Sequence, residues 1–136
     1  MSEPSLALQK AIRDRLVATL EIVALVPADN IFDRSARPER FPCIVLGDGY
    51  SDFAHLYETF HDRAFADLHI WSEENSLTGV KTIAGLVRKA LTTSPLTVDG
   101  FDCRDLAVVS GRYLRDPDGL HAHAVVSLEA IMMETA

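Results

Sequence analysis

Histidine is the residue type through which this chain could most readily bind a metal ion. His121 and His123 form a His-x-His pair in a segment that predicts a strand. Residues two apart on a strand share a face, so two imidazole rings could act as ligands there, with a third ligand from His69 or a nearby Asp. The pair also begins its strand directly after a turn, where side chains are usually solvated. We therefore expect exposed histidines and assign no metal-binding residue.

A thiol nucleophile is the second chemistry to consider. Cys43 could be paired with a base from the polar segment that follows it, which contains His55 and His61. However, Cys43 lies in an apolar run, where a thiol is normally inert. We therefore assign no catalytic residue and expect that the protein is not an enzyme.

The chain has two cysteines, Cys43 and Cys103, without a CxxC motif or zinc-ligand spacing. Two cysteines do not make a disulfide framework. We interpret both as free thiols in a reducing compartment, with a bridge between them as the alternative.

Glycines and acidic residues cluster in three places that could be mistaken for binding loops. Gly47-Asp48-Gly49 lacks the third glycine and the following helix of a dinucleotide-binding loop. Asp99-Gly100 and Asp116-Pro117-Asp118-Gly119 are typical of tight turns, and the latter lacks the spacing and terminal Glu of a calcium loop. We therefore assign no cofactor and no cofactor-binding residue.

Three further side chains have two interpretations each. Trp71 lies at the end of a predicted strand. It is either a core or sheet-edge aromatic or an anchor in a subunit interface. Arg112 and Arg115 precede the last turn, either as surface charges or as partners for acidic residues of a neighbouring subunit.

The first half of the chain predicts one helix and three strands. Ser5 can cap a helix of about 20 residues that ends at Pro27. Short strands follow at Ile31-Phe32 and at Cys43–Leu46, the latter covered on both faces and ended by Gly47. Tyr50–Asp62 is polar and predicts a long loop or a hairpin tip. Arg63–Trp71 alternates in polarity and predicts a strand. The apolar stripe of the helix is Leu8, Ile12, Leu16, Leu20 and Val23.

The second half predicts a helix followed by hairpins. Asn75 or Ser76 can cap a helix, which Ser94-Pro95 ends. Leu96–Phe101 predicts a tight hairpin with Asp99-Gly100 as its turn. Leu106–Leu114 and Ala122–Met132 predict a second, longer hairpin. The apolar stripe of the helix is Val80, Ile83, Ala84, Val87 and Leu91.

The order helix, strands, helix, strands, ending in a long hairpin, predicts an α+β fold. We expect a single domain over 1–136, with one mixed or mainly antiparallel sheet and two amphipathic helices packed on one face. The 136 residues, 48% of them hydrophobic, suffice for one core. No signal peptide or membrane span is evident, which predicts folding in the cytoplasm and no membrane partner. The net charge of −7 disfavours nonspecific nucleic acid binding.

Five segments in this order resemble the tail-completion or tail-terminator proteins of long-tailed phages and phage-derived gene-transfer particles. The resemblance extends from about Leu6 to Met132. The segments are Phe41-Pro42-Cys43-Ile44-Val45-Leu46-Gly47, Leu68-His69-Ile70-Trp71-Ser72, the helix Val80–Leu91, Pro95-Leu96-Thr97-Val98-Asp99-Gly100 and Arg115-Asp116-Pro117-Asp118-Gly119.

The resemblance implies a structural protein that forms a ring, usually of six copies, which ends the tail tube and then joins the head connector. The implied partners are other copies of the chain, the tail tube protein and the head–tail connector, with DNA passing through the lumen without specific binding. The implied location is the tail of a virion or phage-like particle, assembled in the bacterial cytoplasm. We expect the segment Gly49–Asp62 and the hairpin tip around Pro117 to make neighbour or tube contacts. The alternatives are a tube or stopper subunit and a small metal- or thiol-dependent enzyme.

Overall fold

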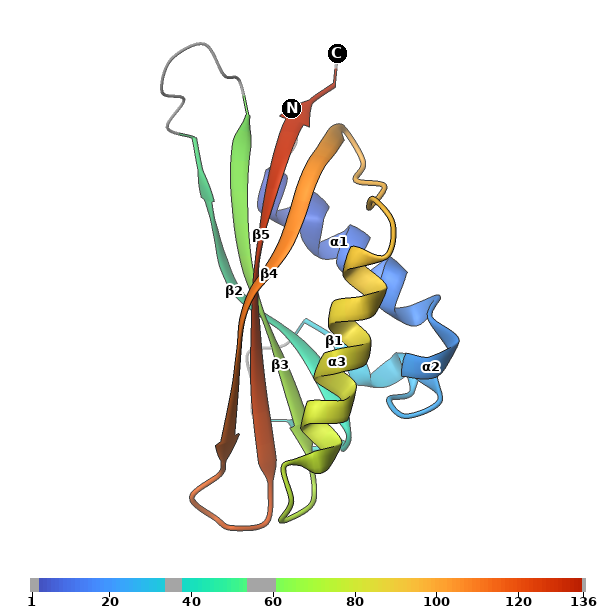
Figure 1. The fold of residues 1–136 in the computed structure, drawn as a ribbon, viewed down its shortest axis with the longest axis vertical. Coiled ribbons are helices and arrows are strands. Elements are labelled where there is room, and N and C mark those ends of the chain that lie inside the picture. The colour runs from blue at the N-terminus through green and yellow to red at the C-terminus, as the bar shows by residue number, and fades with distance from the viewer. Residues whose placement is uncertain (1–2, 34–37, 54–60, 136) are drawn as a thin grey trace.

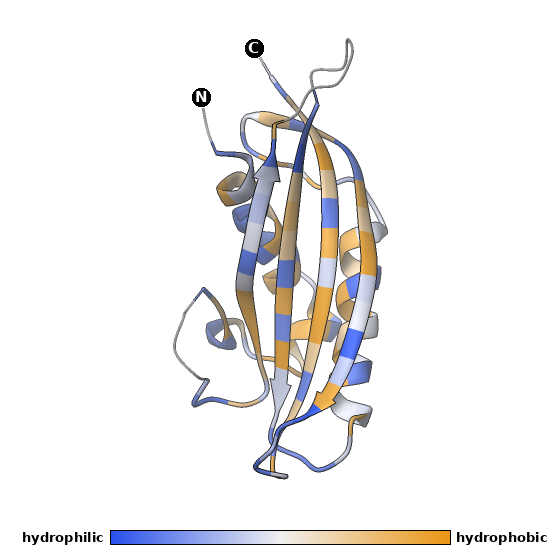
Figure 2. Cartoon of the chain, turned by 90° about the vertical axis from the view of Figure 1, so that its left-hand side faces the viewer, coloured by the Kyte–Doolittle hydropathy of each residue, from blue (hydrophilic) through white to orange (hydrophobic). Residues whose placement is uncertain are grey.

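A computed structural model of the chain describes residues 3–33, 38–53 and 61–135. A five-stranded sheet carries the helices on one face, and its other face is turned toward the viewer in Figure 2. The strand order is β1-β2-β3-β5-β4; β1 and β2 are parallel and every other neighbouring pair is antiparallel. This architecture confirms the predicted α+β fold with one mixed, mainly antiparallel sheet that ends in a long hairpin (Figure 1).

The elements have the following bounds. The helices are α1 (Pro4–Val17), the single turn α2 (Leu20–Val23) and α3 (Thr78–Thr92), with a 3-10 turn η1 at Ala28–Asn30. The strands are β1 (Ile31–Phe32), β2 (Cys43–Asp52), β3 (Asp62–Ser72), β4 (Phe101–Arg115) and β5 (Ala122–Glu134). Within the described part of the chain, no helix is long and apolar enough to span a bilayer.

The first helix is shorter than its apolar pattern predicts. α1 ends at Val17, Thr19 adopts an extended backbone, and α2 begins at Leu20. The Thr19 hydroxyl donates a hydrogen bond of 2.7 Å to the Arg15 carbonyl, which satisfies a group freed by the break. At the start, Glu3 and not Ser5 is the cap: its carboxylate accepts the Ser5 N–H at 3.1 Å.

Strand β2 is longer than the sequence predicts. Cys43–Leu46 is fully buried, as expected for a strand covered on both faces. The strand does not end at Gly47; it passes through a bulge between Leu46 and Gly49 and continues to Asp52. A bulge inserts an extra residue without ending the pairing, and the sequence cannot distinguish it from a break. Tyr50–Asp52 is therefore strand, not loop, and residues 54–60 of the predicted loop lie outside the described residues.

Helix α3 packs its predicted stripe onto the sheet beside α1. Val80, Ile83, Ala84, Val87 and Leu91 are all buried. At its start, the Ser76 hydroxyl accepts the Thr78 N–H at 3.0 Å. Each large apolar side chain buried in this layer contributes about 1.5–3 kcal/mol relative to exposure. The largest fully buried side chains include Leu8, Ile12, Leu16, Ile44, Leu68, Ile70, Leu91 and Leu128.

The two predicted turns form, but the first hairpin does not. Gly100 and Gly119 have φ values of 82° and 72°, which glycine adopts without strain. Val98 and Phe101 flank Asp99-Gly100 but make only an isolated bridge, so Leu96–Val98 is not a strand. β4 instead begins at Phe101, earlier than predicted, and pairs with β5 along its whole length.

Candidate functional site

The histidines of the His-x-His pair have separate surroundings. His121 precedes β5 and lies against the β4–β5 turn, where its Nδ1 is 2.6 Å from an Asp118 carboxylate oxygen and its ring is 4.6 Å from the Phe41 ring. His123 lies within β5 and contacts His69 on β3 instead. Both histidines are half-buried, not exposed as expected. The structure does not bring the two imidazole rings into one ligand set with His69.

His123 lies in a stack of rings on the sheet face opposite the helices. Its ring is 3.9 Å from the Trp71 ring and nearly parallel to it, and its Nε2 is 2.8 Å from His69 Nδ1. Burial lowers the pKa of His123 to about 4, and repulsion from His69 and Arg112 adds to the effect. The ring is therefore neutral at pH 7 and acts in packing. Sequence periodicity placed His69 and Trp71 on one face of their strand; only the pairing of β3 with β5 showed that His123 stacks with them.

The β4–β5 turn holds the one group of metal-ligating side chains found among the described residues: Asp116, Asp118 and His121. The Asp118 carboxylate already accepts N–H groups of Leu120 and His121, at 2.8 and 3.2 Å. The Leu120 N–H is the main reason that the pKa of Asp118 falls to about 2. These contacts account for the acidic residues as parts of the turn, as the sequence predicts.

The two cysteines are free thiols at opposite ends of the sheet. Burial raises the pKa of Cys43 to about 11, so its reactive thiolate is scarce at neutral pH. Burial also raises the pKa of Cys103, which lies on β4. His55 lies outside the described residues, and His61 immediately precedes β3. The structure thus agrees with an inert thiol at Cys43.

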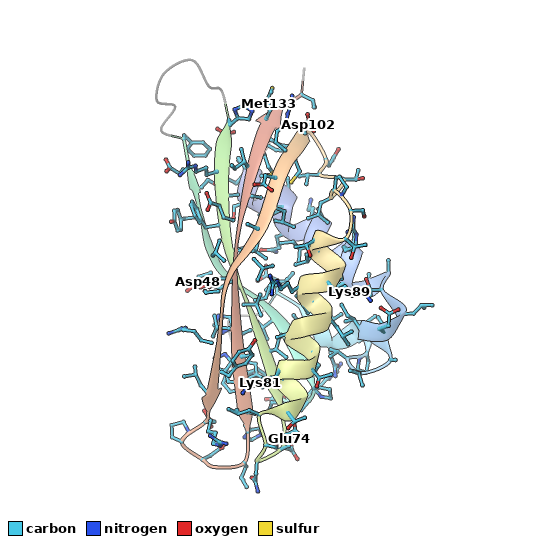
Figure 3. All side chains as sticks on the ribbon, in the orientation of Figure 1. Asp48, Glu74, Lys81, Lys89, Asp102 and Met133 are labelled. Atoms are coloured by element: carbon cyan, nitrogen blue, oxygen red, sulfur yellow. The ribbon has the colours of Figure 1, made fainter. Side chains whose placement is uncertain are left out.

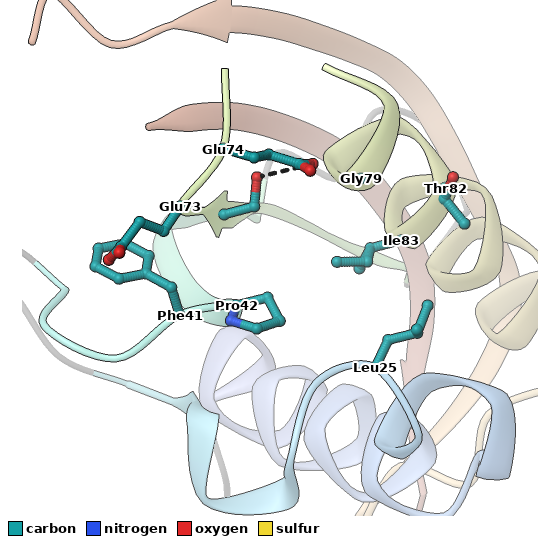
Figure 4. A pocket seen from close by; sticks show the side chains of 9 residues that line it. Leu25, Phe41, Pro42, Glu73, Glu74, Gly79, Thr82 and Ile83 are labelled. Atoms are coloured by element: carbon teal, nitrogen blue, oxygen red, sulfur yellow. Dashed lines mark hydrogen bonds between the residues drawn. The ribbon is translucent and has the colours of Figure 1, made fainter. Parts of the chain in front are cut away.

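A pocket of about 360 Å³ opens beside the start of α3 (Figure 4). Leu25, Phe41 and Ile83 give it apolar walls, and Glu73 and Glu74 lie at its rim. Glu74 accepts a hydrogen bond from Ser72 at 3.3 Å. The pocket combines apolar surface with acidic groups, which suits a contact with an apolar or basic side chain of another protein.

The remaining singled-out residues lie on β3 and β4. Trp71 is half-buried in the ring stack, and Arg112 and Arg115 are exposed on β4. Beside β4, a groove of about 370 Å³ runs between this strand and α3 and is lined by Lys81, Arg88 and Tyr113 among others. The sequence does not predict this groove, because a groove between an edge strand and a helix depends on how the two pack.

Comparison with known proteins identifies relatives along nearly the whole chain. Residues 10–133 match the model of a family described as tail completion protein gp17. The chain is similar to the tail completion protein gp17 of Bacillus phage SPP1, with 25% identity over 124 residues that cover 91% of this chain and 90% of that protein.

Two solved structures share the fold. A chain in the virion of a native gene transfer agent particle matches with a TM-score of 0.83 and 16% identity, covering 97% of this chain and 98% of that one. The structure of bacteriophage SPP1 gp17 matches with a TM-score of 0.62 and 24% identity, covering 93% of this chain and 88% of that one. At these identities the two structures establish a common fold.

Proposed function

The chain belongs to the tail completion protein gp17 family, and from this membership we propose that it is a structural subunit that forms a ring at the end of a phage-like tail. The ring ends the tail tube and provides the surface that meets the head–tail connector. The supporting observation is the extent of the match, which covers 91% of this chain and 90% of the SPP1 protein. The likeness therefore concerns the whole domain and not a shared fragment.

The shape of the subunit supports two different contact surfaces. The start of β4 and the end of β5 lie at one end of the molecule, and the β4–β5 turn lies at the other (Figure 1). The turn end also carries Glu74 (Figure 3), which lines the pocket. A protein that stops tube growth needs unlike surfaces toward the tube and toward the connector, because like surfaces would let the tube continue to polymerise.

The charge of the chain supports a lumen through which DNA passes without binding. Each copy has a net charge of −7, and a ring multiplies this charge. Phosphates are repelled by a surface of the same sign, so a ring of such copies provides no electrostatic grip on DNA. The proposed setting is a particle tail assembled in the bacterial cytoplasm, with the tube protein and connector as partners.

Microscopy of particles produced without this chain tests the proposal. We expect tails of uncontrolled length or tails and heads left apart, with complete particles restored when the chain is supplied. Complete particles in its absence would contradict the proposal. A total absence of tail tubes would also contradict it, and would indicate a tube subunit instead.

A further inference from the structure

The pocket beside the start of α3 combines apolar walls with an acidic rim. Leu25, Phe41 and Ile83 form walls, and Leu25 is 45% exposed although its side chain is large and apolar. Among the described residues that line the pocket, Glu73 and Glu74 are acidic and none is basic. The volume of about 360 Å³ lies near the lower end of the range for ligand pockets, about 300–1,000 Å³. The pocket therefore has room for a side chain of a partner.

The carboxylate of Glu74 is held in a defined position at this pocket. The Ser72 hydroxyl donates a hydrogen bond of 3.3 Å to its Oε1, as the dashed line in Figure 4 shows. A Cβ at position 79 would overlap the same oxygen, so the carboxylate lies directly against the backbone of Gly79 in the first turn of α3. Negative charge is favoured at a helix N-terminus. Glu74 is thus a pre-positioned acceptor, and Leu25 and Pro42 lie across the pocket from it (Figure 4).

His121 joins the pocket to the tip of the β4–β5 hairpin. Its ring is 4.6 Å from the Phe41 ring in the pocket wall, and its Nε2 is 3.9 Å from Oε2 of Glu73. Its Nδ1 is 2.6 Å from Oδ2 of Asp118 in the turn. Leu120, beside His121, is 62% exposed. The pocket and the tip therefore form one surface at the turn end of the molecule, and a partner that reaches the tip also reaches the pocket.

An arginine side chain matches both parts of this pocket. Its methylene groups can pack on Leu25 and Ile83, as long basic side chains do on apolar surface. Its planar guanidinium group can stack on the Phe41 ring and donate paired hydrogen bonds to a carboxylate. A lysine side chain would match the charge but not the planar geometry. A purely apolar side chain would remove water from Glu73 and Glu74 without replacing the hydrogen bonds of that water.

The place of the pocket indicates which protein supplies the arginine. The pocket lies at the turn end of the molecule, one of the two ends that the proposed function turns toward the tube and the connector. Copies within one ring meet side by side, whereas their ends meet the next component of the particle. Arg40 and Arg115 are exposed basic residues of this chain, which makes a second copy the alternative source that the experiments must exclude.

We propose that this pocket binds an arginine side chain of another protein of the particle, with Glu74 as the main hydrogen-bond acceptor. The identity of the partner rests on the function proposed above. The preference for arginine is a property of the chain alone and can be measured without a particle. Failure of the pocket and failure of the proposed function can therefore be recognised separately.

Binding of two short peptides to the isolated chain tests the pocket. The probes are acetyl-Gly-Arg-Gly-amide and the same peptide with citrulline, which has the shape of arginine without its charge. The arginine peptide should shift the backbone amide NMR signals of Gly79 and Ile83 saturably. The citrulline peptide should bind roughly tenfold more weakly, because hydrogen bonds to charged groups are the stronger ones. Glu74→Gln should weaken arginine binding by a similar factor while it retains an acceptor for the Ser72 hydroxyl. Equal shifts with both peptides, or none with either, would overturn the proposal.

Charge reversal in particles tests the contact with the partner. Glu74→Arg should reduce complete particles roughly tenfold, because it places a like charge opposite the incoming arginine. Glu21→Arg is the matched control, since it makes the same change at an exposed position of α2 outside the pocket lining, and it should assemble normally. Normal numbers of complete particles with Glu74→Arg would overturn the proposal. If complete particles form without the chain, the proposed function fails, and peptide binding still decides whether the pocket takes arginine.

A photo-crosslinking variant identifies the partner without a change in the pocket itself. Asn75 is exposed, follows Glu74 and lies outside the pocket lining. After irradiation of particles, Asn75→p-benzoylphenylalanine should link the chain to a different particle protein, at a segment that contains arginine. Lys89→p-benzoylphenylalanine, near the other end of α3, is the control and should not give this product. Links only between two copies of this chain, or no links, would overturn the proposal.

Discussion

His123 is a half-buried proton-binding group whose charge state affects stability. Its ring is stacked on Trp71 and hydrogen-bonded to His69, and its pKa is about 4. An unfolded histidine has a pKa near 6.5. Between these values the unfolded chain binds a proton at this position that the folded chain does not, so folding becomes less favourable as the pH falls.

We therefore predict an acid-dependent loss of stability between pH 6.5 and about 4 that depends on His123. In wild type, the contribution of His123 is fully present above pH 6.5 and is lost as the pH falls toward 4. His123→Gln should flatten this dependence, because glutamine binds no proton. Melting temperatures at pH 7.5, 6.0 and 4.5 measure it, with His61→Gln as the control. An unchanged slope in His123→Gln would show that another group is responsible.

Gly47 lies so close to β3 that there is no room for a side chain at this position. A Cβ at this position would lie 2.5 Å from Cδ2 of His69 and 3.0 Å from the Asp67 carbonyl oxygen. Gly47→Ala should therefore destabilise the fold by about 1–3 kcal/mol, as overpacking does. Gly85→Ala is the matched control, since its Cβ meets nothing within 4 Å and alanine favours a helix by about 0.5–1 kcal/mol. Urea unfolding should give opposite signs for the two changes; equal signs would contradict this account.

At the scale of elements, the β4–β5 hairpin combines a rigid turn with an exposed tip. Asp116 accepts the Gly119 N–H at 2.9 Å, and Asp118 accepts further N–H groups. The strands below the turn pair from Arg115 and Ala122 onward, and the first irregularity in their register comes only between Ser110 and Val108. The register of the hairpin therefore does not depend on which residue occupies position 117.

We predict that replacing the tip around Pro117 with a short Gly-Ser turn leaves the domain folded and blocks assembly. The long β4–β5 pairing holds the strands together, so circular dichroism should stay native with a modest fall in melting temperature. Particle assays should show heads and tails that remain apart. Normal numbers of joined particles would refute a role for the tip. A Gly-Ser replacement of the segment between β2 and β3 must be confined to residues 53–61, because Gly49–Asp52 belongs to β2.

At the scale of the whole molecule, the two faces of the sheet have different roles. One face is covered by α1 and α3 (Figure 1), and the other carries the stacked rings of His69, Trp71 and His123. Arg15 of α1 also binds the end of α3, donating to the carbonyls of Ala90 and Pro95 at 2.7 and 3.0 Å. The helix layer is thus held as one unit.

Elements and turns whose signals are local could be predicted from the amino-acid sequence. The apolar stripe of α3, the alternation of β3 and the glycines at positions 100 and 119 all predicted what the structure contains, because periodicity and backbone freedom act over neighbouring residues. The ordered set of short motifs likewise indicated the family that the comparisons confirm.

Tertiary structure alone decided how these elements meet. The break after Val17, the bulge that extends β2 past Gly47 and the binding of Arg15 to α3 depend on segments far apart in the chain. The stack of Trp71 on His123 and the position of β4 as an outer strand of the sheet follow from strand order and register. A strand pattern shows which side chains share a face, but it does not name the neighbouring strand, since pairing is chosen by packing across the whole sheet.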